Sequence, residues 1–558
     1  MHIFRFTGFI CMVLAAQIHV AQSTYSFSST DIIQRLKTDV HTLASEEMEG
    51  REAGTQGERK AADYISQQME EAGVDPLFDG SWFQEFTFHG DWTYGEDNFF
   101  NIGEREFVFQ EDFFVLPNAA SSHVYAQGVY VGYGLKKEDY NDYADLEQLE
   151  DKVFFIEYYL PEEIDDSGEN LPLEKLQQKT ETAIEKGALA IVFVNTQGNR
   201  TDPPTHLQQD LGREEIPIFF ARQELVEYFQ QLQEDEYLFI SADIYRKTYT
   251  AINVAGYWDN NADHTVVIGG HYDHLGMGGR TSRSPGVQQI HYGADDNASG
   301  VAGVLEAARF LPQAHFTSNN YLFIAFSAEE KGLLGSRHFT LSDAYDMGKV
   351  NYMFNLDMIG RMIDNQLTIL GTGTSPLWDE TIEKADTDIN IRKVPAGVGG
   401  SDHTNFYHQQ IPALFFFTGI HEDYHRPSDT PDKINYEGLA EVLSLAYNMI
   451  AVLDNKGKLE FTTAPATRRG SPRREGPTLG VMPDHGFSGN GMKIQAVIDD
   501  RPAQKAGIID GDVIVRLGDV RVSDIRTYME GLDKLSKNDT INILIIRGDE
   551  EIELEVEL

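Results

Sequence analysis

Short, continuously apolar runs alternate with segments of helical spacing between residues 251 and 455. Apolar runs without polar alternation are typical of strands buried on both faces, as in a sheet that carries helices on both sides. We therefore predict an α/β domain here, with a mixed, mostly parallel sheet flanked by helices. The expected strands are 265–270, 321–326, 352–356, 366–370 and 413–417, and the expected helices are 298–311, 377–385 and 436–453.

The remaining segments differ from this domain in character. Residues 31–74 have helical spacing interrupted by a loop, and residues 120–245 contain short apolar strands with one helical run at 175–187. Residues 462–477 are rich in Thr, Arg, Gly and Pro, which is typical of a linker. The predicted parts are an export signal (1–23), the first part of the α/β domain (24–119), a β-rich insert (120–245), the main part of the α/β domain (246–456), a linker (457–476) and a compact β-rich C-terminal unit (477–558).

The N-terminus has the features of a cleaved export signal. Arg5 precedes an apolar run over residues 6–16, and Ala21-Gln22-Ser23 offers small residues for cleavage. The run is too short to cross about 30 Å of hydrocarbon as a helix, and no other segment is apolar enough to do so. We expect a secreted or periplasmic protein with no integral membrane segment in the mature chain.

Charge and cysteine content narrow the classes of ligand. The chain has 89 acidic and 45 basic residues, a net charge of −44, which repels phosphate backbones and disfavours nucleic acid as a partner. Its single cysteine, Cys11, lies inside the predicted export signal. The mature protein should therefore lack disulfides and thiolate metal sites, so His and carboxylate side chains must hold any bound metal.

Four polar segments fall at predicted strand ends or a helix start of the α/β domain, and a fifth follows the last predicted strand and a loop. In open α/β sheets, ligands bind beyond the carboxyl ends of the strands, so these segments could converge on one crevice. Each is weak alone, because histidines at strand ends are commonly structural, acidic pairs are frequent in so acidic a chain, and Asp often caps helices. Their coincidence favours a metal site. The segments are 269–274, 293–300, 326–330, 355–358 and 424–429.

The residue types in these segments suit a pair of divalent metal ions. Imidazole and carboxylate ligands without thiolate are typical of catalytic zinc with an open position. Asp273 lies two residues after His271 on the same predicted strand face, so its carboxylate could accept the other ring N–H of His271 and fix the tautomer. One bridging carboxylate would leave a His and an acid for each metal. A further carboxylate would take the proton of a metal-bound water.

These motifs, in this order, resemble the secreted co-catalytic di-zinc aminopeptidases, whose more distant relatives include glutamate carboxypeptidase and the transferrin receptor. The resemblance covers about 25–120 and 246–455 and implies two Zn²⁺ per chain. It implies that Asp296 is the bridging ligand and Glu329 the general base. The other implied roles are His271 and Asp357 as ligands of one zinc, Glu330 and His425 as ligands of the other, and Asp273 as the partner of His271.

Two further segments resemble known modules. Residues 120–245 resemble a protease-associated domain, which in such enzymes serves as a lid or partner surface. Residues 477–558 resemble a PDZ domain, with Leu479-Gly480-Val481 at the position of the carboxylate-binding loop. Such a loop captures the C-terminus of a peptide or protein ligand. The alternative, that this unit only packs or tethers, remains open.

The resemblance implies an exported zinc-dependent aminopeptidase that hydrolyses N-terminal residues from peptides with a free N-terminus, by a two-zinc, metal-bound-hydroxide mechanism. One alternative is a di-zinc carboxypeptidase or dipeptidase on the same scaffold, which would need basic groups for the substrate carboxylate. Another is a catalytically silent binding protein that acts through its protease-associated and PDZ modules. Loss of ligands would mark such a protein, and every ligand position of the motifs is filled.

Overall fold

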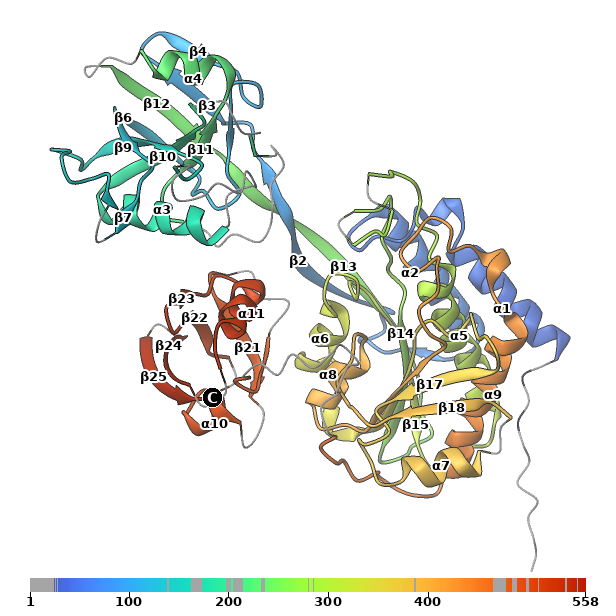
Figure 1. Ribbon diagram of the computed structural model, residues 1–558. Helices are drawn as coiled ribbons and strands as arrows, with labels where there is room; N and C mark the ends of the chain where they lie inside the picture. Colours follow the sequence, from blue (N-terminus) through green and yellow to red (C-terminus); the bar gives the residue numbers. More distant parts are fainter. Residues whose placement is uncertain are drawn as a thin grey trace, which may run out of the picture. The chain divides into compact units, whose positions relative to one another are not determined.

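A computed structural model describes residues 25–558 apart from short gaps (Figure 1). The predicted export signal, including Cys11, and most of the predicted linker lie outside the described residues. The parts not described are 1–24, 26, 28, 138–139, 162–172, 197–201, 204–213, 232–235, 280, 285, 386–387, 465–477, 484–488, 498–500, 510, 537–538 and 549.

The α/β domain contains a nine-stranded mixed sheet in the order β1-β13-β15-β14-β16-β19-β17-β18, with β2 pairing with β13 beside this path. The central strands β15, β14, β16 and β19 are parallel, and β13 and β17 pair antiparallel with β15 and β19. The predicted α/β class is confirmed. The strands are β1 (Asp75–Pro76), β2 (Phe83–Tyr94), β13 (Ile244–Trp258), β14 (Thr265–His271), β15 (Asn320–Phe326), β16 (Val350–Leu356), β17 (Gln366–Leu370), β18 (Asn390–Val394) and β19 (Ala413–Phe417).

Helices bury both faces of this sheet (Figure 1). Successive residues of β15 point to opposite faces: Tyr321 packs in the core formed with α1, α5 and α9, whereas Leu322 packs with Phe339 of α6 and Phe406 of α8. Burial on both faces explains why the strands read as continuous apolar runs. The helices are α1 (Thr30–Leu43), α2 (Gln56–Glu71), α5 (Gly300–Phe310), α6 (Leu334–Leu341), α7 (Trp378–Lys384), α8 (His403–His408) and α9 (Tyr436–Leu453).

A second core belongs to an eight-stranded sheet in the order β4-β3-β12-β6-β9-β10-β11-β5. The predicted start of this insert at residue 120 is wrong, because β3 pairs with β12 and β5 pairs with β11. Phe100 and Phe113 are buried in the same core. The elements are β3 (Phe99–Ile102), β4 (Arg105–Phe107), β5 (Phe113–Val115), β6 (Ser122–Gly132), β9 (Lys152–Glu157), α3 (Leu173–Glu185), β10 (Ala188–Val194), β11 (Ile218–Ala221), α4 (Gln223–Phe229), β12 (Tyr237–Ala242) and the pair β7 (Lys136–Lys137) and β8 (Tyr140–Asn141).

The C-terminal unit is a six-stranded sheet with its own core, which includes Ile514 and Ile543. The unit also contains helix α11, whose N-cap Asp524 forms a capping box with Thr527. The elements are β20 (Val481–Pro483), β21 (Met492–Val497), α10 (Pro502–Lys505), β22 (Val513–Leu517), β23 (Val520–Arg521), α11 (Ile525–Asp533), β24 (Thr540–Arg547) and β25 (Glu550–Glu557).

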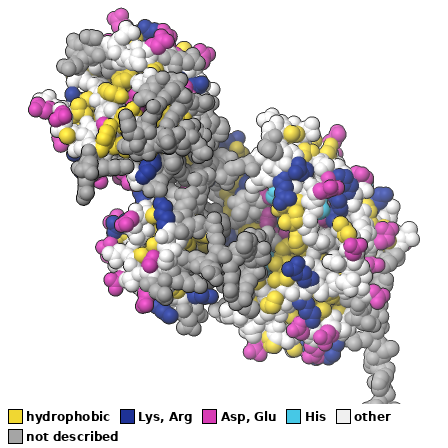
Figure 2. Space-filling view, in the orientation of Figure 1, with side chains coloured by type: hydrophobic (Ala, Val, Ile, Leu, Met, Phe, Trp, Pro, Cys, Tyr) yellow, Lys and Arg dark blue, Asp and Glu magenta, His cyan; other side chains and the backbone are white. Residues whose placement is uncertain are grey.

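The surface carries the acidic excess. Figure 2 shows Asp and Glu side chains dispersed over the visible face rather than gathered in one patch. This distribution is typical of solvated charge that keeps a protein soluble. Among the described residues, no helix combines the length and the apolar composition needed to cross a bilayer.

Candidate metal centre

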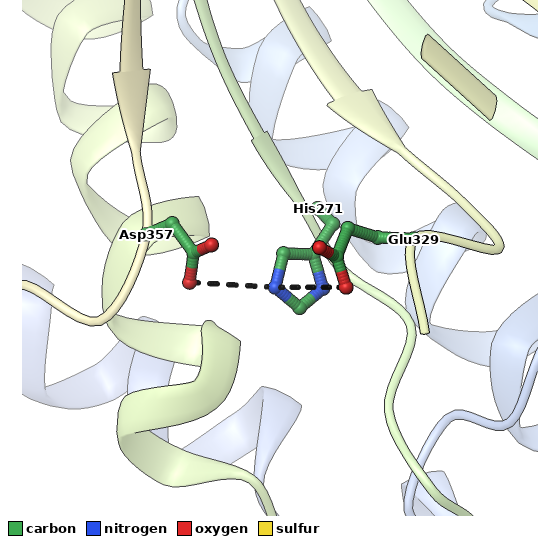
Figure 3. Close-up of side chains that lie close together, drawn as sticks. All are labelled: His271, Glu329 and Asp357. Atoms are coloured by element: carbon green, nitrogen blue, oxygen red, sulfur yellow. Dashed lines mark ion pairs between the residues drawn. The ribbon is translucent and has the colours of Figure 1, made fainter. Parts of the chain in front are cut away.

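Three parallel strands end at the same edge of the nine-stranded sheet, and an ionisable side chain stands at or just after each end. His271 is the last residue of β14, Glu329 follows β15 closely, and Asp357 follows β16 directly. His271 lies opposite Phe326, the last residue of β15. Figure 3 shows the three side chains directed toward one another. The sheet therefore brings together charged groups that lie far apart in the sequence.

His271 is the centre of the first group of ligand atoms. Its Nε2 atom lies 3.2 Å from Oδ1 of Asp296, 3.4 Å from Oδ1 of Asp357 and 3.9 Å from Oε2 of Glu329. His271, Glu329 and Asp357 each offer one ligand atom within 4.8 Å of the others. Geometry alone thus leaves Glu329 two roles, as a ligand or as a proton acceptor beside the metal.

A second group of ligand atoms forms around the other oxygen of Asp296. Nε2 of His425 lies 3.2 Å from Oδ2 of Asp296. His274, Asp296 and Glu330 offer ligand atoms within 4.8 Å of one another. The two oxygens of Asp296 therefore face different groups of ligands, as a bridging carboxylate requires.

The turn η2 (Ala294–Ser299) holds Asp296 in place. The Asp429 carboxylate accepts the backbone N–H groups of Asp295 and Asp296, at 2.9 and 3.1 Å. The Asn297 amide donates to the carbonyl oxygens of His271 and Leu356, at 3.1 and 3.0 Å. The peptide bond between Asp296 and Asn297 is cis. Asn297 thus ties the turn to the ends of β14 and β16.

The second ring nitrogen of each predicted histidine ligand faces a backbone carbonyl. Nδ1 of His271 lies 3.1 Å from the carbonyl oxygen of Asp273, and Nδ1 of His425 lies 3.0 Å from that of Thr281. The Asp273 carboxylate, the predicted partner, is 3.7 Å from Nδ1 of His271 and accepts the backbone N–H of Glu329 at 3.0 Å. The chain leaves the strand after His271, so the alternation assumed for Asp273 does not continue. Both rings keep Nε2 for a metal.

The donor set fits a bound divalent metal pair. Oδ2 of Asp296 and Oδ1 of Asp357 are buried and have no hydrogen-bond partner among the described residues, although desolvated carboxylates are costly unless a cation or donor compensates them. Burial lowers the pKa of His271, but the nearby Glu329 and Asp357 carboxylates raise it well above its usual value. Burial also raises the pKa of Asp357. Buried negative charge beside imidazole, without thiolate, suits zinc.

Two family models match the chain. Residues 253–450 match the model of Peptidase family M28, and residues 472–558 match the model of the PDZ domain. All seven predicted site residues lie within the first match. Residues 253–450 belong to peptidase family M28. The C-terminal unit is a PDZ domain.

Relatives of the M28 domain include aminopeptidases. Aminopeptidase YwaD of Bacillus subtilis (strain 168) is 27% identical over 277 residues, which are 47% of this chain and 57% of that protein. A probable zinc metalloprotease of Pyrenophora tritici-repentis (strain Pt-1C-BFP) is 42% identical over 101 residues, 18% of this chain and 21% of that protein. The chain therefore spans little more than half of the first relative and a fifth of the second.

A solved structure is also similar to this chain. The aminopeptidase from Aneurinibacillus sp. strain AM-1 is 24% identical, with a TM-score of 0.45, over 81% of this chain and 100% of that one.

Sequence reasoning missed three residues of the M28 centre. His274 is fully buried, and its Nδ1 lies 3.8 Å from Oδ2 of Asp296. Asp429 orients the Asp296 turn. Asp402 is fully buried, and burial raises its pKa to about 7 against the influence of His271. The signal for His274 was its place in the His271 segment, and that for Asp429 was its place in the His425 segment. Asp402 lies in none of the five polar segments.

Asn297→Ala is expected to destabilise the metal-free M28 domain by about 2–4 kcal/mol, because buried carbonyl groups of β14 and β16 lose their donor. Scanning calorimetry in the presence of a chelator measures the loss. Asn448→Ala is the matched control: within the described part of the chain its amide pairs with the backbone of Tyr25 alone, the first described residue, so about 1 kcal/mol is expected. Equal losses in the two variants would contradict this role of Asn297.

Proposed function

We propose that the chain is an exported zinc-dependent aminopeptidase that hydrolyses N-terminal residues from peptides with a free N-terminus and binds two Zn²⁺. The observation that carries the proposal is the position of Asp296, whose two carboxylate oxygens each lie 3.2 Å from a different histidine, His271 and His425. An acidic side chain accompanies each histidine. The names of the M28 relatives support the same activity.

Hydrolysis of a peptide bond at this site would need only the metal ligands, a general base and a residue that positions the base. A bound zinc pair supplies an acidified water and polarises the carbonyl of the scissile bond. Asp296, His271 and Asp357 would hold one ion, and Asp296, Glu330 and His425 the other. Glu329 accepts the water proton and returns it to the leaving amine, which requires a carboxylate beside the ligands. The Asp273 carboxylate fixes the Glu329 backbone at 3.0 Å and so positions this base.

A free α-amino group suits this site electrostatically, because several carboxylates converge there and attract a cation. One observation favours the alternative carboxypeptidase or dipeptidase. The Arg283 guanidinium lies 4.9 Å from the ring centroid of Tyr424, next to His425, where a cation would attract a substrate carboxylate. A substrate panel separates these functions.

We expect the purified mature chain to hydrolyse aminoacyl chromogenic amides and unblocked peptides, with at least about 100-fold lower rates on N-acetylated versions that lack the α-ammonium charge. A chelator should abolish the activity, and added zinc should restore it. Release of C-terminal residues from N-blocked peptides would support the carboxypeptidase instead. Absence of any hydrolysis by zinc-loaded protein would support the silent binding protein.

We also propose a location for the protein and roles for its β-rich insert and its PDZ domain. The predicted export signal supports a secreted or periplasmic location, which N-terminal sequencing of exported protein tests. We propose that the β-rich insert is a protease-associated domain. The PDZ domain supports capture of peptide C-termini. Binding of peptides with a free C-terminus, compared with their C-terminal amides, tests that capture.

A further inference from the structure

We propose that His274 is an additional metal ligand, on the side of Asp296 that also carries His425 and Glu330. This side of the centre would then offer two imidazoles, and the opposite side one. The inference rests on the proposed function, since it concerns the same metal pair. It adds a histidine that the sequence motifs did not assign.

The position of Asp296 carries the argument. Its Oδ1 faces a single histidine nitrogen, Nε2 of His271 at 3.2 Å. Its Oδ2 faces two, Nε2 of His425 at 3.2 Å and Nδ1 of His274 at 3.8 Å. The rings of His274 and His425 lie 5.9 Å apart at 73°, an edge-to-face arrangement in which each directs a nitrogen toward the same oxygen. His274 also shares a group of ligand atoms within 4.8 Å with Asp296 and Glu330.

The fold holds the His274 ring in this position. Its backbone N–H donates to the carbonyl of Arg51 at 3.1 Å, and its ring is fully buried. Gly293, just before the Asp296 turn, has a φ of +56°, and a Cβ there would lie 2.6 Å from ring carbons of His274. A side chain at Gly293 would therefore clash with the ring and also with the carbonyl oxygen of Asp296, which would lie 2.2 Å from that Cβ. Backbone and packing together keep Nδ1 directed at Asp296.

With His274 as a ligand, the two metal positions would differ in their number of protein ligands. With Asp296 shared, the first side has three protein ligands, His271, Asp357 and Asp296, which leaves a position open for water or substrate. The second side would have four: Asp296, Glu330, His425 and His274. Four-coordinate sites bind zinc as closed, structural-type centres. Two imidazoles also favour zinc, cobalt and nickel over magnesium and manganese.

His274→Asn tests the proposal in the zinc-loaded full chain. Titration with a chelator should remove one zinc at about 100-fold lower chelator concentration than in the unaltered protein, since even partners that only orient ligands are worth 10- to 100-fold in affinity. The other zinc should be retained as before. X-ray absorption at the zinc edge should count three imidazoles over two zinc ions in the unaltered protein and two in the variant.

His291→Asn is the matched control. His291 is equally buried and its ring lies 6.5 Å from that of His274, but its Nε2 faces the Ser282 hydroxyl at 2.8 Å. This variant should keep both zinc ions and all imidazole ligands. Circular dichroism and the metal-free melting temperature show whether each variant folds, and His274→Gln is a second variant if His274→Asn does not.

Two results would overturn the inference while leaving the proposed function intact. One is an unchanged affinity for both zinc ions in folded His274→Asn. The other is a lowered affinity with an unchanged imidazole count, which would make His274 a positioning residue for Asp296. An unaltered protein that binds fewer than two zinc ions would instead refute the metal pair of the proposed function.

Discussion

Replacing Glu329 by glutamine is expected to lower kcat about 10²- to 10⁴-fold, the range that general acid–base catalysis contributes, while both zinc ions stay bound. Glutamine has nearly the size of glutamate but cannot take up the proton of the attacking water. The Glu329 side chain is only 11% exposed and its Oε2 lies 3.9 Å from Nε2 of His271, which places the carboxylate beside the proposed metal pair. Steady-state kinetics and metal analysis of the same preparation measure both quantities.

Glu437→Gln is the control for this experiment, because Glu437 is an exposed residue in the first turn of α9. Its kcat and zinc content should equal those of the unaltered protein. Loss of zinc from Glu329→Gln would show that Glu329 is a ligand, as its place in the His271 group allows. The assignment of Glu329 as the base would then be wrong.

Asp296→Asn is expected to remove both metals and to reduce activity to the background rate. The two oxygens of Asp296 face His271 and His425, so this one change affects both groups of ligands. Asparagine also replaces the negative carboxylate that would lie between two divalent ions with a neutral amide. Metal analysis after dialysis, together with activity on an aminoacyl chromogenic amide, measures the effect.

Two comparisons sharpen the Asp296 experiment. Asp357→Asn should weaken one zinc and leave the other, because Asp357 lies 3.4 Å from Nε2 of His271 and in no second group. Asp379→Asn, at a 70% exposed side chain, should change neither zinc nor activity. Retention of two tightly bound zinc ions in Asp296→Asn would rule out a bridging role.

Local patterns predicted the α/β domain and most of its centre. His271 and Asp357 follow continuous apolar strands, and charge at the end of such a strand has no packing role to explain it. Because neighbouring parallel strands end at one edge, their order along the chain was enough to bring these residues together. The folded structure then gives the distances between these side chains, which cannot be obtained from their spacing in the sequence.

The failures have equally local causes. Strands β3 and β5 are as rich in phenylalanine as the core strands of either sheet, so only their pairing with β12 and β11 assigns them to the insert. Asp273 was placed on the same strand face as His271, but β14 ends at His271. The chain turns there, which brings the Asp273 carbonyl to one histidine and the His274 ring to Asp296.

The ligands of the centre come from segments spread widely along the chain. His271 and His425 lie about 150 positions apart, with Asp296, Glu329, Glu330 and Asp357 between them. Contacts at such separations require the loops between them to close, which costs chain entropy. A nascent chain therefore cannot assemble both groups of ligands until His425 has been synthesised and the central strands have paired. Tight binding of a metal pair would therefore be expected only in molecules whose central strands have already paired, whereas a folded molecule can still lack metal.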